Sequence, residues 1–337
     1  MGAKFQKQGM VASVLALAMV CGLPVAAQAQ TVLRVATDSG AEGSPSGEAI
    51  ANWARAIEEG SNGDLRVRVF YQEQLGNQLE VFDLFVAGEV DLMLSWPSTS
   101  YDQRIGVLNT PYMVTSWEEA FEAYQPGGWV NGVLNEVFND MGLVYFGAWP
   151  EGFNGVATRG KMAITVDEAR EQGMRVRVPP FFPFSQTLEA MGYQTAAIAW
   201  GEVFTSIQTG VVDGEAGNVI YWDYEYFRDV LDYYVQTRHN FVTGNLLANQ
   251  ASFERLTPEQ QALVRDAAVA EMEKRFENAR AEDEKYIALA QEAGMVYVLP
   301  DDDQFAALAE SVRAAVWPVM AEQIGDDIVD LIRANAR

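Results

Sequence analysis

One histidine and one cysteine limit the acid–base and nucleophilic chemistry open to this chain. His239 lies in a β-rich stretch beside aromatic residues, where a structural histidine is far more common than a catalytic base, and Cys21 lies near the N-terminus. A single imidazole cannot assemble the usual zinc ligands, and the glycine patterns that cradle phosphates are absent. The 47 acidic residues permit a paired-carboxylate hydrolase by number, but no pair stands out by spacing. We therefore expect no enzyme, no cofactor and no metal site.

Composition favours a globular protein with two lobes. The 337 residues are 49% hydrophobic and 21% charged, and their formal net charge is −24. That length suffices for two cores at roughly 100 to 200 residues each. So strong an acidic excess repels nucleic acid and anionic lipid, so neither is expected as a partner.

Residues 1–29 have the features of a cleavable export signal. Lys4 and Lys7 precede the apolar run 10–20, and the small-x-small pattern at 27–29 suits a signal peptidase. A transmembrane anchor fits less well because the apolar run is too short. A lipoprotein anchored at Cys21 is the other alternative, but residues 18–20 match its cleavage pattern poorly. We expect a periplasmic protein.

Short apolar runs alternate with helical patterns along the rest of the chain. One expected helix places Ile50, Trp53 and Ile57 on a single face. This alternation predicts an α/β fold with parallel sheets covered by helices. Strands are expected at residues 32–38, 65–71, 90–96, 143–149, 174–179 and 295–299.

Two segments of the sequence echo each other. Residues 85–91 and 207–213 both read as a helix end, a glycine (Gly88, Gly210) and the start of an apolar strand, and both reach an aspartate (Asp91, Asp213) three positions after the glycine. Glycine at such a position can adopt the left-handed conformation that ends a helix. The echo indicates two similarly built lobes, although helix–glycine–strand junctions are also common in unrelated folds.

A long helix is expected near the C-terminus. Thr257 is a suitable N-cap, Pro258 suits the first helical position, and no helix breaker follows until Gly294. At 1.5 Å per residue, about 36 residues would span roughly 54 Å. A helix of that length would have to cross both lobes or bend.

Two motifs carry a resemblance to a known family. The first is Gly173-Met-Arg-Val-Arg-Val-Pro179, and the second is Trp200-Gly-Glu-Val-Phe-Thr-Ser-Ile-Gln-Thr-Gly-Val-Val-Asp213-Gly. Together they resemble the substrate-binding proteins of tripartite ATP-independent periplasmic (TRAP) transporters, the DctP-like family. Weaker matches at residues 71–76 and 109–112 agree in order and spacing. The resemblance covers nearly the whole chain after residue 31.

The resemblance implies a two-lobed periplasmic binding protein with a ligand cleft between the lobes and a long helix spanning both. The family's lobes are discontinuous, so we expect residues 30–151 and 243–283 in lobe I, and residues 152–242 and 284–337 in lobe II. The implied partners are a small organic acid and the membrane subunits of a TRAP transporter.

The same resemblance implies a set of ligand contacts. Arg177 matches the arginine that holds the ligand carboxylate in the family, and a guanidinium can do so with two parallel hydrogen bonds. Strand alternation places Arg175 on the same face, but Arg177 is nearer the strand's C-terminal end, where clefts of α/β sheets lie. A surface arginine paired with an acid is the alternative. The other expected contacts are Asp38, Trp96, Phe153, Asn154, Trp200, Gly217 and Asn218.

Two departures from the family pattern bear on the ligand. Asn154 replaces a second family arginine, and the expected asparagine is either shifted to Asn218 or replaced by Gly217. With one arginine fewer and an acid at Asp38, a dicarboxylate is a poor fit. A monocarboxylate with an apolar part fits, as does a zwitterion such as ectoine, whose binders similarly show Pro-Glu-Gly, here residues 150–152. A ligand-sensing module for a receptor is a further alternative, and a secreted hydrolase is the least favoured.

Overall fold

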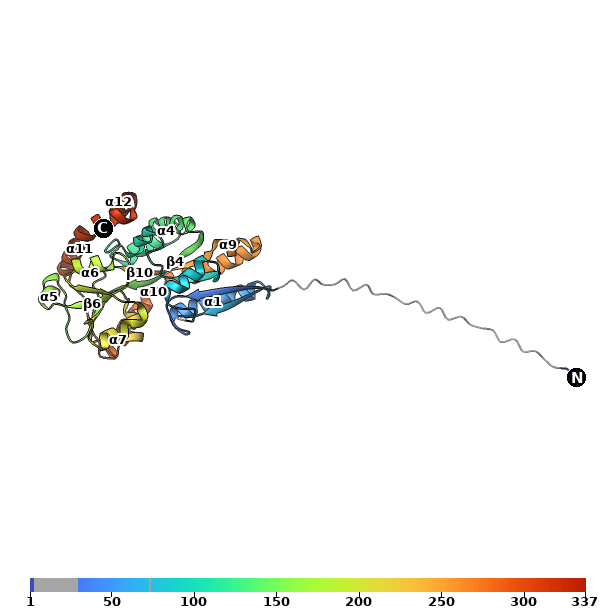
Figure 1. The fold of residues 1–337 in the computed structure, drawn as a ribbon, viewed down its shortest axis with the longest axis horizontal. Coiled ribbons are helices and arrows are strands. Elements are labelled where there is room, and N and C mark those ends of the chain that lie inside the picture. The colour runs from blue at the N-terminus through green and yellow to red at the C-terminus, as the bar shows by residue number, and fades with distance from the viewer. Residues whose placement is uncertain (3–29, 73) are drawn as a thin grey trace.

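The computed structural model describes residues 1–2, 30–72 and 74–337. Apart from its first two residues, the predicted signal peptide lies outside the described residues. Within the described ranges, no helix is both long enough and apolar enough to span a bilayer. The chain folds into two α/β lobes, with the first (blue) and second (yellow-green) lobes side by side in Figure 1.

The first lobe is built on a five-stranded sheet in the order β2-β1-β3-β10-β4. β1 runs parallel to β2 and β3, whereas β10 runs antiparallel to both β3 and β4. The strands are β1 (Thr31–Thr37), β2 (Leu65–Phe70), β3 (Leu92–Ser95), β4 (Leu143–Phe153) and β10 (Phe241–Asn249). The accompanying helices are α1 (Pro45–Gly60), α2 (Gln78–Val86), η1 (Gln103–Asn109), α3 (Trp117–Tyr124), α4 (Trp129–Asp140) and α9 (Gln250–Glu254).

The second lobe is built on a six-stranded sheet in the order β11-β9-β5-β8-β6-β7. Its strands are β5 (Val156–Thr158), β6 (Arg175–Val178), β7 (Gln194–Ala197), β8 (Gly214–Glu215), β9 (Tyr233–Val235) and β11 (Val296–Val298). Its helical elements are α5 (Val166–Glu171), α6 (Phe184–Ala190), η2 (Trp200–Glu202), α7 (Val203–Gln208), α8 (Ile220–Trp222) and η3 (Asp223–Phe227).

The strands expected from the sequence form, but the sheets are mixed rather than parallel. β4 carries the chain out of the first lobe, and β10 brings it back beside β4. A strand that leaves and a strand that returns must run in opposite directions when they are neighbours. β5 is likewise antiparallel to β8 and β9 in the second lobe. The prediction of parallel sheets therefore holds for the βαβ units of each lobe and for the pair β9 and β11, but not for the strands at the lobe crossings.

The internal echo corresponds to two copies of one unit. Both β1-α1-β2-α2-β3 and β6-α6-β7-α7-β8 place their first strand in the middle, in the orders β2-β1-β3 and β7-β6-β8. Gly88 and Gly210 end the second helix of each unit with φ of 78° and 76°. The expectation of two similarly built lobes is confirmed for these units.

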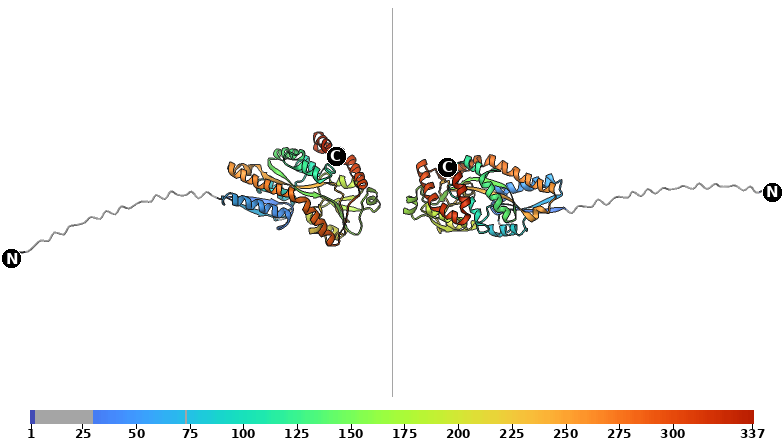
Figure 2. Two further views of the ribbon diagram at one scale, coloured as in Figure 1. Left: turned by 180° about the vertical axis from the view of Figure 1, so that it is seen from behind. Right: turned by 90° about the horizontal axis from the view of Figure 1, so that it is seen from above.

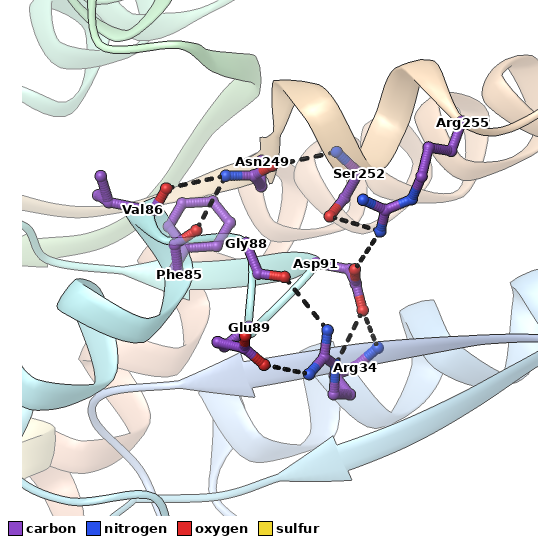
Figure 3. Close-up of polar contacts among 9 residues, drawn as sticks. All are labelled: Arg34, Phe85, Val86, Gly88, Glu89, Asp91, Asn249, Ser252 and Arg255. Carbon is purple, nitrogen blue, oxygen red and sulfur yellow. Dashed lines mark hydrogen bonds and ion pairs between the residues drawn. The ribbon is translucent and has the colours of Figure 1, made fainter.

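The same pair of hydrogen bonds between an aspartate and the backbone of an arginine, here called the aspartate lock, is present in each unit. In the first lobe the Asp91 carboxylate accepts a hydrogen bond from Arg34 N at 2.8 Å, as Figure 3 shows. In the second lobe the Asp213 carboxylate accepts one from Arg175 N, also at 2.8 Å. The backbone N–H of each aspartate also donates to the carbonyl of the same arginine, at 2.9 and 2.7 Å. The echoed aspartates therefore join the first and third strands of their units.

The long helix is present as α10 (Pro258–Glu292), a single element of 35 residues. Thr257 and Gln260 form a capping box at its start, and Pro258 occupies the first turn. It packs on α1 and β4 of the first lobe and on α8 and β11 of the second. The left view of Figure 2 shows it running diagonally, in orange, across both lobes. The prediction that this helix crosses both lobes is confirmed.

Helix packing fixes the first lobe against α10. Ile50, Trp53 and Ile57 of α1 are fully buried, as their shared face predicts, and the Trp53 indole N–H donates to the Val264 carbonyl of α10 at 3.0 Å. At the other end of the chain, α11 (Asp302–Ile324) packs on both η1 and α6, and α12 (Asp326–Asn335) packs on α11. Helix α11 thus contacts both lobes. The predicted lobe boundaries stay a prediction.

Candidate ligand-binding site

A cavity lies between the two lobes, at the ends of their central strands. Its walls combine an arginine, an acid, several amides and a set of aromatic rings. The first lobe supplies Ser39, Gln78, Trp96, Asn109, Glu151 and Thr243, the segment before β10 supplies Asn240, and the second lobe supplies Arg177, Phe181, Trp200, Gly217, Asn218 and Trp222.

Arg177 is the buried cation of the cavity wall. It lies near the C-terminal end of β6 and is 3% exposed, whereas Arg175, at the start of the strand, is exposed. Arg177 Nε donates to the Ile198 carbonyl at 2.9 Å, and its guanidinium lies 6.0 Å from the Trp200 ring centre. Burial lowers the pKa of Arg177 from its usual value, which neighbouring acids oppose. Strand position therefore separates the two arginines, as the sequence predicts.

Two buried carboxyl groups lie directly behind Arg177. Glu215 Oε2 is 3.4 Å from Arg177 Nη1, and both side chains are almost completely inaccessible to solvent. Asn218 connects the two acids: its backbone N–H donates to Glu215 at 3.4 Å and its side-chain amide donates to Asp223 at 2.9 Å. Burial raises the pKa of Glu215, and it raises that of Asp223 well above its usual value.

An aromatic wall encloses a further acid, Glu151. Its two carboxylate oxygens accept the indole N–H groups of Trp96 and Trp222 at 3.1 and 3.0 Å. The Trp96 and Trp222 rings meet edge to face at 6.3 Å, and Trp200 meets Trp222 in the same way at 5.5 Å. Glu151 is only 3% exposed, and burial raises its pKa to about 7. The result is a carboxyl group surrounded by indoles at the cavity wall.

Asp38 supports this wall from behind. Its carboxylate accepts hydrogen bonds from Ser95 Oγ at 2.6 Å and from Trp96 N at 3.2 Å. Burial raises the pKa of Asp38 to about 7, and its Oδ1 has no hydrogen-bond partner among the described residues. Asp38 is therefore next to the cavity and fixes the backbone of Trp96, while its neighbour Ser39 lines the cavity itself.

The structure brings together part of the predicted set. Of the eight predicted contacts, five line the cavity: Arg177, Trp96, Trp200, Gly217 and Asn218. A side chain at Gly217 would place its Cβ 2.7 Å from Pro179 Cδ, so only glycine fits there. The amide next to this glycine, Asn218, therefore supplies the polar group.

Phe153 and Asn154 do not line the cavity. Phe153 packs in an aromatic cluster with Trp117 and Phe241. Asn154 Oδ1 accepts from Asn240 N at 2.8 Å, and its amide donates to His239 Nε2 at 2.9 Å. These bonds join the two segments that connect the lobes. The residue that replaces a family arginine thus holds the connecting segments together.

His239 is a structural residue, as its surroundings in the sequence suggest. Because Nε2 accepts from the Asn154 amide, Nδ1 carries the proton and donates to Thr237 Oγ1 at 2.7 Å. The side chain is fully buried, and burial lowers its pKa to about 3. A neutral imidazole with both nitrogens occupied has no capacity left for ligand or acid–base chemistry.

Among the residues that sequence reasoning missed, four supply the acids and the aromatic wall in and behind the cavity. Glu151 belongs to the Pro-Glu-Gly motif, but nothing in the motif places its carboxyl between two indoles. Trp222 and Asp223 lie in short helical turns that have no periodic pattern. Glu215 follows Gly214 in the two-residue strand β8, and its sequence gives no sign that it faces Arg177. Only the fold brings these residues together.

The arrangement is suited to binding a small molecule. It offers one guanidinium, several amide and hydroxyl groups and flat aromatic faces in a partly open cavity between the lobes. Within the described part of the chain, no group of three or more His, Cys, Asp or Glu side chains is arranged to hold a metal ion.

Two α/β lobes with a cavity of polar and aromatic side chains between them, joined by crossing strands and one long helix, are the architecture of a bilobed solute-binding protein. The chain belongs to the bacterial extracellular solute-binding proteins of family 7, the DctP family, whose sequence profile matches residues 36–323. This is a family of transport proteins rather than enzymes.

Individual relatives agree with this assignment. The ectoine-binding periplasmic protein TeaA of Halomonas elongata is 23% identical over 284 residues, covering 82% of each chain. The structure is similar to that of a TRAP periplasmic solute-binding protein from Sulfitobacter sp. NAS-14.1 with bound β-D-galacturonate, with a TM-score of 0.82, 23% identity and coverage of 90% and 100%. The structure is also similar to that of a TRAP periplasmic solute-binding protein from Sulfurospirillum deleyianum with bound succinate, with a TM-score of 0.81 and 19% identity. The match covers 92% of this chain and 100% of that one. At these identities the two structures show the shared fold.

Proposed function

We propose that this protein is exported by cleavage of residues 1–29, captures a small organic acid in the periplasm, and delivers it to the membrane subunits of a TRAP transporter. The observation that carries the proposal is Arg177, a buried guanidinium on the wall of a cavity between two lobes. Membership of family 7 supports the transport role.

The geometry of Arg177 suits a carboxylate. The Ile198 carbonyl and Glu215 hold Nε and Nη1, so the guanidinium plane is fixed before a ligand arrives. The guanidinium hydrogens that these contacts leave free are available to a ligand carboxylate, and Asn218 and Asn240 also line the cavity. Fixed donors lose little conformational entropy on binding, which favours affinity for a small guest.

Thermal unfolding with a ligand panel tests this proposal. The panel contains galacturonate, succinate, an aromatic monocarboxylate and ectoine, added to protein that has been unfolded and refolded to remove any bound molecule. A ligand at about 100 times its dissociation constant adds roughly 2.7 kcal/mol and raises the unfolding temperature by several degrees. If no carboxylate in the panel raises that temperature, the proposal of an organic-acid receptor is rejected.

A zwitterionic solute such as ectoine is the second candidate. The observation that favours it is the Glu151 carboxyl between Trp96 and Trp222, because indole faces and an acid together suit a cationic group. A ligand would then place its carboxylate on Arg177 and its cationic part against the aromatic wall. TeaA, an ectoine-binding relative, supports this candidate.

Replacing Glu151 separates the two candidates. E151Q keeps an oxygen acceptor for one indole N–H but removes the negative charge, so a cationic ligand should lose about tenfold in affinity, worth roughly 1.4 kcal/mol. A monocarboxylate without a cationic group should bind the variant at least as tightly as wild type. Titration calorimetry with ectoine and galacturonate measures both at pH 8, above the Glu151 pKa of about 7, where wild type carries the charge. Equal losses for the two ligands would reject charge recognition by Glu151.

The lobe boundaries belong to the same proposal. We place residues 30–151 and 243–283 in lobe I and residues 152–242 and 284–337 in lobe II, with ligand capture closing the lobes. In support, the chain leaves the first sheet after Phe153 and re-enters it at Phe241. A closed form that instead signals to a receptor would differ in its partner and not in its site.

A further inference from the structure

The carboxyl pair behind Arg177 has a feature that the proposed function does not explain. Glu215 and Asp223 are both fully buried, and Asn218 holds them side by side from its backbone and side-chain nitrogens. Asp223 Oδ2 has no donor among the described residues. Two ionised carboxylates this close and this buried would repel each other strongly. A single proton held between them removes the repulsion and gives the unpartnered oxygen a partner.

The charged and titratable groups around Glu215 and Asp223 do not remove the repulsion between two ionised carboxylates. Arg177 on β6 is the nearby cation and carries one positive charge. From β9, the Tyr234 hydroxyl donates to the Asn218 carbonyl at 3.2 Å, and burial keeps its pKa far above the usual value, so it stays neutral. One guanidinium can balance one carboxylate. The arrangement of one arginine and two acids is therefore neutral only when the acids carry one proton.

We propose that Glu215 and Asp223 share one proton and together form a built-in counter-ion for Arg177, so that a ligand carboxylate enters the cavity with uptake of a second proton. This inference rests on the proposed function, in that it takes Arg177 as the carboxylate contact. Glu215 is then a specificity-determining residue: it limits the negative charge that the site accepts, because a dianion would require further proton uptake or leave unbalanced charge in the cavity.

Proton uptake makes the affinity for the ligand depend on pH. When binding takes up one proton, the dissociation constant rises up to tenfold for each pH unit above the range in which the pair takes up that proton. A site in which Glu215 only orients Arg177 would show no such dependence between pH 6 and 8.5. The pH profile therefore separates proton coupling from simple positioning.

The first experiment needs no ligand. Carbon-13 NMR of protein labelled at Asp and Glu side-chain carboxyls follows each group from pH 4 to 9 in wild type, E215Q and D223N. We expect a carboxyl signal that changes well above the range of exposed acids and disappears in both variants, with D213N in the matching second-lobe lock as control. D223N keeps an oxygen that can accept from Asn218, so it should fold even if E215Q does not. If both carboxyls titrate in the range of exposed acids, the shared proton is rejected.

The second experiment measures the proton taken up. Titration calorimetry with galacturonate and with ectoine, at pH 7 in two buffers of different ionisation enthalpy, gives the number of protons bound per ligand. We expect uptake approaching one proton for wild type and none for the double variant E215Q/D223N, which has no ionisable acid left in the pair and should therefore bind galacturonate more tightly than wild type at pH 8. Binding without proton uptake would overturn the inference while leaving the organic-acid receptor intact. Failure of both probes to bind would instead count against the proposed ligands, and the carboxyl titration still decides whether the proton is shared.

Discussion

At the scale of single residues, four buried acids (Asp38, Glu151, Glu215 and Asp223) lie in or beside the cavity wall, and Arg177 is the buried cation of that wall. Burial raises the pKa of Asp38 and of Glu151 to about 7, far above the values of exposed carboxyl groups. Each of these groups is held by donors rather than by a salt bridge: Ser95 and a backbone N–H for Asp38, and two indoles for Glu151.

Asp38 gives a prediction for stability. Its pKa is about 7 in the folded protein and near 3.8 when exposed, so the folded state holds this proton more tightly than the unfolded state does. Stability contributed by the protonated group is then lost as pH rises from about 4 to 7. D38N keeps an acceptor for Ser95 and Trp96 but cannot ionise, so its stability relative to wild type should increase over that interval. Urea unfolding of both proteins at pH 4.5 and 7.5 measures the difference, and an unchanged difference would contradict the assignment.

Residue types predicted some of these contacts and not others. Arg177 could be placed at the cavity because strand direction decides which end of a sheet carries a cleft. The role of Asn154 could not be predicted, because its side chain bonds to His239 and Asn240, which follow it by 85 and 86 residues in the sequence. Glu215 and Asp223 are found only in three dimensions, since their meeting depends on a two-residue strand and a π-helical turn.

At the scale of elements, the protein repeats one βαβαβ unit, and each copy is closed by an aspartate immediately before the third strand. The two locks share their backbone geometry but differ in burial. Asp91 is 2% exposed and also contacts Arg34 Nε and Arg255, at 3.2 and 3.3 Å (Figure 3). Asp213 is 33% exposed and contacts Lys161. A weak sequence echo was sufficient to predict the repeat because the glycine and aspartate have fixed structural tasks in both copies.

The two locks form a matched pair for mutagenesis. D91N should destabilise the protein by about 2 to 3 kcal/mol, because an amide would then face the arginine donors and charged hydrogen bonds are lost. D213N should cost less than about 1 kcal/mol because its partner is a partly exposed lysine. Chemical denaturation of the two variants measures both values. Equal losses would show that burial does not distinguish the locks.

At the scale of the whole molecule, contacts across the cavity hold the two lobes together. Trp96 of the first lobe meets Trp222 of the second, and Thr99 Oγ1 accepts from Phe182 N at 3.2 Å. The Tyr226 hydroxyl accepts from Ala41 N at 3.3 Å. Alternation of strands and helices predicted the α/β class, but it could not predict the antiparallel crossing strands. Strand direction at the crossings depends on the return path of the chain, which local patterns do not record.

These contacts predict a change of shape on binding. A ligand that touches both Trp96 and Arg177 favours the closed arrangement, so saturating ligand should reduce the radius of gyration of the apo protein. Small-angle X-ray scattering with and without ligand measures it. The same scattering profile at saturation would contradict closure of the lobes.

The central claim is that Arg177 holds the carboxylate of the solute in the cavity between the lobes. Its most direct test is titration calorimetry of the panel ligand that stabilises wild type most, applied to R177A, R177K and R175A. Arg175 lies on the same strand but is exposed, so R175A should bind like wild type. R177A should lose about 100-fold or more in affinity, roughly 2.7 kcal/mol, and R177K should recover only part of it because an ammonium cannot make two parallel bonds. Wild-type affinity in folded R177A would contradict the claim.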